Sequence, residues 1–252
     1  MARITSERDL DEAWLRLHTS LARWLASWFP AKTGSILEVG CGRGQITVPL
    51  MELLPDVSIT AVDSFLGPYS RDRVALLTRI RSAGETERVH AIKADALRWI
   101  SSRSPETFDA VVSSELLPEL DSKQMQGFFR NSFRVLRRGG TTTHLFLSPE
   151  ARNPRQHLVI EADSDPRWSR HPPATWFSPN PRSAQRALST AGFRTVQSAT
   201  RRGGLIFTGP AARAQLKRWG VRPAFARAYG RTLREGGLEL PDWVIVSGKK
   251  RY

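Results

Sequence analysis

Apolar residues near the start of the chain recur with the period of an α-helix. Between Thr5 and Phe29 they fall three or four positions apart, at Leu10, Trp14, Leu17, Leu21, Trp24, Leu25 and Trp28. Ser6 and Asp9 resemble a capping pair, and Pro30 follows the run. The pattern therefore predicts an amphipathic N-terminal helix.

Beyond Pro30, short apolar runs alternate with segments of helical period. Strands are predicted over residues 36–39, 57–62, 89–92, 110–112, 144–147, 193–199 and 243–247. Helices are predicted over 45–54, 69–83, 96–101, 122–136 and 182–190, with a basic helical pair over 211–234. This alternation predicts an α/β fold, a doubly wound and mostly parallel seven-stranded sheet with helices on both faces. An N-terminal helix and a basic helical C-terminal insertion are added to it.

The net charge of +14 is concentrated in one part of the chain. The last 71 residues carry 15 Lys and Arg against three acidic residues. Such a bias favours a face that meets a polyanion, with a solvated basic surface as the alternative. The candidate substrate contacts are Arg213, Lys217, Arg218 and Arg222. Trp219, Phe225 and Tyr229 between them either stack on bases or belong to a core.

The single cysteine, Cys41, excludes an internal disulfide and a cysteine-cluster metal site, and it favours a reducing compartment. The histidines have no metal-ligand spacing, so we expect no metal site. No run of about 18 apolar residues occurs. We expect a cytoplasmic protein without a membrane partner, whose oligomeric state the sequence leaves open.

The motif with the most chemical content is ILEVGCGRGQIT, residues 36–47, which joins a predicted strand to a predicted helix. Its glycines, at Gly40, Gly42 and Gly44, permit a tight turn and a close approach of a ligand to the backbone. A dinucleotide fingerprint places a glycine where Gln45 stands, and it has no need of the Glu38 carboxylate. The motif therefore favours a ligand with a cationic group.

This stretch resembles the first motif of the class I S-adenosylmethionine-dependent methyltransferases, an acidic residue followed by G-x-G-x-G. The resemblance implies that Glu38 lies near the methionine ammonium of S-adenosylmethionine and that the glycine loop passes beneath this cofactor. It extends over about Ser35 to Leu147 and includes FFRNSFRVLRRGGTTTHLFLS, which is similar to the family's helix, R-V-L-x-x-G-G turn and strand.

Two further carboxylates follow strand ends in register with the glycine loop. Asp63 in SITAVDS is placed to accept the ribose hydroxyls, with a turn residue as the alternative. Asp95 in AIKADALRW resembles the family's contact to the adenine amino group, and it also suits the N-cap of the next helix. The cofactor-binding candidates are Glu38, Gly40, Cys41, Gly42, Gly44, Asp63, Ser64, Asp95, Ala96 and Ser114.

The fourth strand, in FDAVVSSELLPEL, supplies the position from which this family's catalytic or substrate-orienting residues project. The candidates are Ser113, Ser114, Glu115 and Glu119. The family's Asn/Asp-Pro-Pro-aromatic tetrad is absent, which disfavours exocyclic amino methylation of a base. The two glutamates resemble the arginine-methyltransferase loop with altered spacing, and a loop before a capped helix of residues 121–136 is the alternative.

Methyl transfer needs mainly in-line positioning, so a missing catalytic signature does not argue against an enzyme. The charge bias favours an anionic macromolecule, RNA above all, as the acceptor. Protein arginine or lysine side chains, a small molecule bound under residues 168–177, and a non-catalytic cofactor-binding RNA-interaction module remain as alternatives.

The chain divides into four predicted parts. Residues 1–34 form a helix covering the cofactor site, and 35–148 form the methyltransferase core. Residues 149–181 form a Pro-rich substrate-side loop. Residues 182–252 complete the sheet and carry the basic insertion.

Overall fold

The computed structural model of the chain describes residues 1–66, 71–170 and 180–251. Within them, seven strands form one sheet in the order β4-β3-β2-β5-β6-β10-β7. Their bounds are β2 (Ser35–Val39), β3 (Ser58–Asp63), β4 (Val89–Lys93), β5 (Phe108–Ser114), β6 (Leu136–Leu147), β7 (Arg194–Arg201) and β10 (Trp243–Lys249). Strands β2 to β6 are parallel, whereas β10 runs antiparallel to both β6 and β7. The predicted mostly parallel α/β sheet is confirmed.

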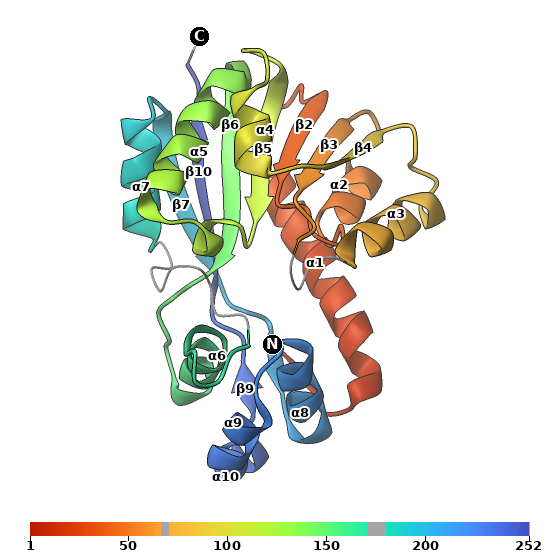
Figure 1. The fold of residues 1–252 in the computed structure, drawn as a ribbon, viewed down its shortest axis with the longest axis vertical. Coiled ribbons are helices and arrows are strands. Elements are labelled where there is room, and N and C mark those ends of the chain that lie inside the picture. Colours follow the sequence, from red (N-terminus) through yellow and green to blue (C-terminus); the bar gives the residue numbers. More distant parts are fainter. Residues whose placement is uncertain (67–70, 171–179, 252) are drawn as a thin grey trace.

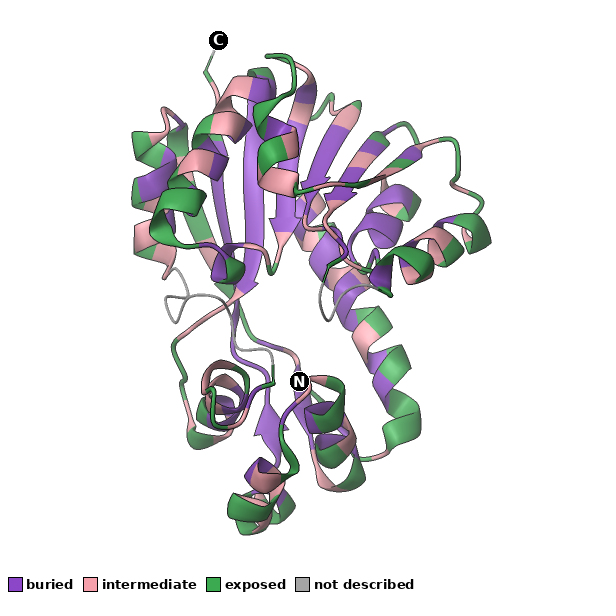
Figure 2. Cartoon of the chain, in the orientation of Figure 1, coloured by how far each residue is buried: buried purple, intermediate pink, exposed green. Residues whose placement is uncertain are grey.

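Helices cover both faces of this sheet because neighbouring strand residues point to opposite sides. Ile36 belongs to a core cluster with α1 (Leu10–Ala26), α2 (Thr47–Leu53) and α3 (Asp72–Ser82). Leu37, the next residue, belongs to a second cluster with α4 (Ala96–Ser101), α5 (Ser122–Val135) and α7 (Pro181–Thr190). The central strands are buried along most of their length (Figure 2).

A smaller lobe lies beyond one end of the sheet (Figure 1). It contains a three-stranded sheet, β1 (Ala2–Ile4), β8 (Leu205–Phe207) and β9 (Leu238–Glu239). Its helices are α6 (Pro154–Ser164), α8 (Gly209–Arg218), α9 (Pro223–Ala228) and α10 (Gly230–Glu235). Helix α1 runs from this lobe to the large sheet and packs on α2, so it joins the two parts (Figure 1).

The prediction of a loop over residues 149–181 is wrong where α6 lies. Asn153 caps that helix, since its Oδ1 accepts the Gln156 N–H at 3.0 Å. Pro154 occupies the first helical position, where the missing N–H costs nothing. Prolines between predicted elements favour a loop, but Pro154 begins a helix. Residues 171–179 of this segment lie outside the described residues.

Three further boundaries differ from the prediction. The basic pair over 211–234 is three helices, α8 to α10. The predicted R-V-L-x-x-G-G turn, residues 134–140, covers the last two residues of α5 and the start of β6, which begins at Leu136. The pairing of β6 with β5 is irregular between Phe108 and Ala110. Helix α3 begins at Asp72, and the predicted start at Tyr69 lies outside the described residues.

Candidate functional site

The carboxyl ends of the central parallel strands meet at one edge of the sheet. Glu38 of β2 is in register with Val112 of β5, and Asp63 at the end of β3 is in register with Lys93 of β4. Asp95 follows β4 by two residues. The topology therefore brings three of the predicted carboxylates to the same edge, where ligands bind in open α/β sheets.

The loop after β2 has the left-handed backbone that its glycines were predicted to provide. Gly40, Gly42 and Gly44 have φ values of 77°, 48° and 76°. The Gly40 N–H donates to Val62 O at 2.8 Å, which holds the loop against β3. This region of φ is costly for side-chain-bearing residues.

Gly44 has a structural reason for being glycine as well. A Cβ at this position would come within 2.5 Å of the Leu76 side chain on α3. The residue permits close packing of the loop against that helix, whereas a Cβ on Gly42 would lie 3.8 Å from the nearest atom, a carboxylate oxygen of Asp72. Gly42 is thus the more open of these two predicted cofactor contacts.

Glu38 is an acid buried without a cation. Its side chain is 1% exposed, and its Oε2 has no hydrogen-bond partner among the described residues. The pKa of Glu38 is raised to about 7, mainly by burial and in smaller part by the Asp63 charge, while the nearby Thr47 hydroxyl favours the ionised form. Thr47 Oγ1 also lies buried with no hydrogen-bond partner there. A bound ammonium group would satisfy this carboxylate.

Asp63 holds the loop that it was predicted to serve. One carboxylate oxygen accepts the Gly42 N–H at 2.9 Å, and the other accepts the Phe65 N–H at 2.8 Å. The carboxylate thereby fixes the glycine loop and the turn after β3. Each oxygen retains a second lone pair for a ligand hydroxyl, so the turn role and the ribose role are compatible.

The remaining predicted cofactor residues lie around this edge with different surroundings. Asp95 is the N-cap of α4, its Oδ1 accepting from the Leu97 and Arg98 N–H groups at 3.1 Å. Cys41 is 5% exposed, and burial raises the pKa of its thiol. Ser64, Ala96 and Ser114 are half-buried next to the strand ends. The Asp95 N-cap is observed, and its adenine contact stays a prediction.

Glu115, just beyond β5, occupies an unusual backbone position. It is one of few non-glycine residues with positive φ, at 56°. Its Oε1 accepts the Leu147 N–H at 2.7 Å, which ties it to the end of β6. The residue is exposed, yet the protein around its carboxylate is the main reason why its pKa is raised to about 8, and the Leu147 hydrogen bond opposes this rise.

Two other carboxylates, Asp163 of α6 and Glu119, lie within electrostatic range of Glu115 and contribute to its raised pKa. Desolvation also raises the pKa of Asp163, to about 6. We call Glu115, Glu119 and Asp163 the β5-end carboxylates. Sequence reasoning missed Asp163, because it belongs to the segment that was predicted to be a loop, 48 positions after Glu115.

Ser113, a candidate in the same motif, belongs to the core instead. It is 1% exposed, and its Oγ lies 2.8 Å from Nδ1 of the buried His144. Thr142 Oγ1 lies 2.7 Å from Nε2 of that ring and donates to Val111 O. The Thr142 hydroxyl proton is thus used, so the imidazole donates from Nε2 and accepts from Ser113 at Nδ1. Burial lowers the pKa of His144 to about 3, which keeps it neutral.

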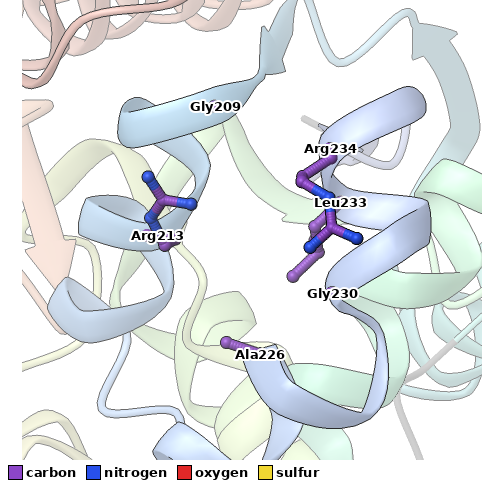
Figure 3. A pocket seen from close by; sticks show the side chains of 6 residues that line it. All are labelled: Gly209, Arg213, Ala226, Gly230, Leu233 and Arg234. Atoms are coloured by element: carbon purple, nitrogen blue, oxygen red, sulfur yellow. The ribbon is translucent and has the colours of Figure 1, made fainter.

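The four basic candidate contacts have different surroundings in the structure. Arg218 pairs with Asp11 at 2.6 Å. Arg213 lines a small pocket of about 80 Å³ with Arg234 between α8 and α10 (Figure 3). Lys217 and Arg222 are exposed. The aromatics between them pack in the small lobe, Trp219 on Phe207, Phe225 on Trp168 and Tyr229 on Phe225. Their core interpretation is therefore the one that the structure favours.

Within the described ranges, no three His, Cys, Asp or Glu side chains gather as metal ligands would. In the same part of the chain, no helix has the length and apolar character needed to span a membrane.

The residues at this edge fit a ligand that combines an ammonium group, ribose hydroxyls and an adenine. The unpartnered Glu38 oxygen suits the ammonium, and Asp63 retains acceptor capacity for the hydroxyls. The open backbone at Gly42 admits a ligand against the loop. The donor set thus agrees with S-adenosylmethionine.

Comparison with known proteins points to methyltransferases, whose methyl donor is the ligand that these residues fit. Residues 36–140 match the family model described as a methyltransferase domain. A curated relative, malonyl-[acyl-carrier protein] O-methyltransferase of Paenibacillus sp. (strain JDR-2), is 30% identical over 114 residues, or 45% of this chain. The match spans only 39% of that relative.

Solved structures share the fold over most of the chain. A SAM-dependent methyltransferase from Archaeoglobus fulgidus has a TM-score of 0.60 at 15% identity, covering 94% of both chains. The [4+2]-cyclase SpnF has a TM-score of 0.61 at 19% identity, covering 92% of this chain and 80% of its own. The name of the second protein is that of a cyclase, so the fold by itself does not fix the reaction.

Proposed function

This chain belongs to the class I S-adenosylmethionine-dependent methyltransferase family, and we propose that it transfers a methyl group to a small-molecule acceptor bound beside the β5-end carboxylates. The observation that carries the methyl-transfer proposal is Glu38, a buried acid with an unpartnered oxygen beneath an open glycine loop. The Glu38 carboxylate is suited to bind the methionine ammonium group of S-adenosylmethionine, the family's cofactor.

On the donor side, S-adenosylmethionine supplies an activated methyl group on a sulfonium. Glu38 would bind its ammonium, Asp63 its ribose hydroxyls, and Asp95 its adenine amino group. The main task of the protein is then to hold donor and acceptor in line, since positioning supplies much of the rate.

On the acceptor side, Glu115 is the candidate general base. A carboxylate whose pKa is raised to about 8 takes up a proton more readily near neutral pH than an ordinary glutamate does. The acceptor heteroatom would bond to the methyl carbon as the S–CH3 bond of the sulfonium breaks and S-adenosylhomocysteine leaves, and its proton would pass to Glu115. Leu147 N–H fixes one oxygen of that carboxylate, which leaves the other for the acceptor.

The charges around Glu115 favour the class of acceptor. Asp163 and Glu119 add negative charge beside it, which repels a phosphodiester or a carboxylate and attracts an amine or a neutral hydroxyl. RNA is the acceptor that the charge bias suggests. It would have to contact the basic residues of the C-terminal region while its methylated group entered the acidic surroundings of Glu115. We favour a small amine or alcohol for this reason.

The relative's name, malonyl-[acyl-carrier protein] O-methyltransferase, supports a small or carrier-bound acceptor as a class. A malonyl group carries a carboxylate, so the acids around Glu115 favour a different group within that class. Protein side chains remain the second candidate, because carboxylates also suit a guanidinium or ammonium group.

The test is incubation of the purified protein with methyl-labelled S-adenosylmethionine and a cell extract separated into small molecules, RNA and protein. With the wild type, label is expected in the small-molecule fraction. In a parallel incubation with the Glu38→Gln variant, no fraction is expected to carry label. Label confined to RNA or protein would overturn the acceptor class. Calorimetry on the wild type that detects no cofactor binding would overturn the methyl-transfer proposal itself.

A further inference from the structure

A second polar pocket lies where the small lobe joins the large sheet. It has a volume of about 200 Å³, well above the roughly 15 Å³ that one water molecule requires. Arg152 and Arg155 line it from the start of α6, Arg202 lies directly after β7, Glu239 belongs to β9, and Asp242 directly precedes β10. Met1, Asn153 and Gln156 complete the lining. We call the space between these residues the junction pocket.

Asp242 supplies a buried acid with spare bonding capacity to this pocket. Its residue is 3% exposed, and Arg152 Nη2 lies 2.5 Å from its Oδ2. The other oxygen, Oδ1, has no hydrogen-bond partner among the described residues. A buried carboxylate oxygen in this state calls for a donor, and an ammonium group is the strongest donor available.

Glu239, the other acid of the pocket, is already satisfied. Its Oε1 accepts from Asn153 Nδ2 and Gln156 Nε2, each at 3.2 Å, and Arg155 Nε lies 3.6 Å from its Oε2. It fixes the start of α6 at the rim of the pocket. Of the two acids, Asp242 is the one with a buried oxygen that has no partner among the described residues.

The opposite requirement comes from Arg202. This exposed residue lines the pocket and forms no ion pair with any residue that the structure describes. The N-terminus of α6, whose first residues lie at the rim, also favours negative charge. The pocket thus offers a buried acceptor for a cation and, separately, a free guanidinium for an anion.

We propose that the junction pocket binds a small zwitterion of the amino-acid type, with its ammonium on Asp242 Oδ1 and its carboxylate on Arg202. The pocket's three arginines outnumber its two acids, which disfavours a simple amine. The buried acid with a free oxygen disfavours a simple anion. A ligand with both groups satisfies both sides.

The junction pocket also connects with the methyl-transfer site. Ser148 N–H donates to Asp242 O at 2.7 Å, and the preceding residue, Leu147, donates to Glu115 Oε1. The last residue of β6 and the residue after it therefore contact a residue of each site.

The experiment measures binding of the common L-amino acids to the whole chain by calorimetry and thermal shift. For each amino acid that binds, the matching amine without the carboxylate and the matching acid without the amine are measured too. Both are expected to bind at least about tenfold more weakly, since each loses one charge-assisted contact. Arg202→Gln should weaken amino-acid binding at least as much, whereas Arg201→Gln should not, because Arg201 hydrogen-bonds to Ser20 at 2.8 Å instead.

Two variants distinguish binding in the junction pocket from binding at the cofactor site, where Glu38 also has a buried oxygen without a partner among the described residues. Glu38→Gln should leave amino-acid binding unchanged, and Asp242→Asn should reduce the advantage of the amino acid over its deaminated acid. Failure of every amino acid to bind would overturn the proposal. Equal binding of the truncated analogues, equal binding by Arg202→Gln, or loss of binding in Glu38→Gln would do the same.

Discussion

Asp63 and Gly42 are joined by a hydrogen bond of 2.9 Å, in which the Gly42 N–H donates to Asp63 Oδ2. The carboxylate therefore shapes the glycine loop before any ligand arrives. A carboxylate that only met the cofactor would leave the loop unchanged when removed. Here its loss is expected to act on both the loop and the ligand.

Asp63→Ala should weaken S-adenosylmethionine binding by about 1.5–3 kcal/mol, or roughly 10- to 150-fold, because hydrogen bonds to a charged acceptor are lost. Calorimetry on the folded variant measures this. Arg98→Ala, next to the other strand-end acid but 91% exposed at its side chain, is a suitable surface control and should bind normally. An unchanged affinity in Asp63→Ala would leave Asp63 with a turn role only.

Glu38 makes the free protein less stable as the pH rises. Its folded pKa is raised from 4.5 to about 7, so the folded state retains a proton that the unfolded state has already lost. Stability is then fully present below about pH 4.5 and is lost as the pH rises to about 7, by about 3 kcal/mol. Urea unfolding of wild type and Glu38→Gln at a series of pH values measures the difference.

Glu38→Gln should remove that part of the slope and be the more stable protein at pH 8 without cofactor. The same variant should bind S-adenosylmethionine at least tenfold more weakly, since the ammonium loses its counter-charge. Parallel slopes for the two proteins would show that Glu38 is hydrated in the free state.

Gly44→Ala should destabilise the fold by more than its backbone angle alone predicts. The new Cβ would lie 2.5 Å from Leu76 Cδ1, in addition to the strain of φ at 76°. Gly84→Ala is the matched control, because its φ is 73° and nothing lies within 4 Å of the added Cβ. We expect about 1 kcal/mol for the control and about 1–3 kcal/mol more for Gly44→Ala, measured by thermal or urea unfolding.

The sequence predicts the cofactor edge well because each of its signals is local. A glycine loop and an acid at a strand end are read from adjacent residues, and parallel strands bring successive ends together. The order in which β10 inserts between β6 and β7 gives no such local signal. It depends on long-range antiparallel pairing, as in the register of Val246 with His144.

The acceptor side is harder to predict because it is assembled from distant segments. Asp163 of α6 acts electrostatically on Glu115. The sequence does not predict α6, because a proline occupies its first position. Charge counting misleads here too, since it adds Arg218 to the free cations although that residue is paired with Asp11. Only the folded chain shows which charges remain unpaired.

The pH dependence of methyl transfer should show whether Glu115 is the base. Its pKa is raised to about 8, and a base acts only when ionised, so kcat/KM should rise with pH to a midpoint near 8. Glu115→Gln should lose that rise and about 10²–10⁴-fold of the rate. Asp163→Asn removes the charge that raises the Glu115 pKa most among the nearby acids. The midpoint should therefore move to lower pH while activity is retained. A midpoint that stays in place in Asp163→Asn would contradict Glu115 as the titrating base and would assign the titration to the acceptor's own proton.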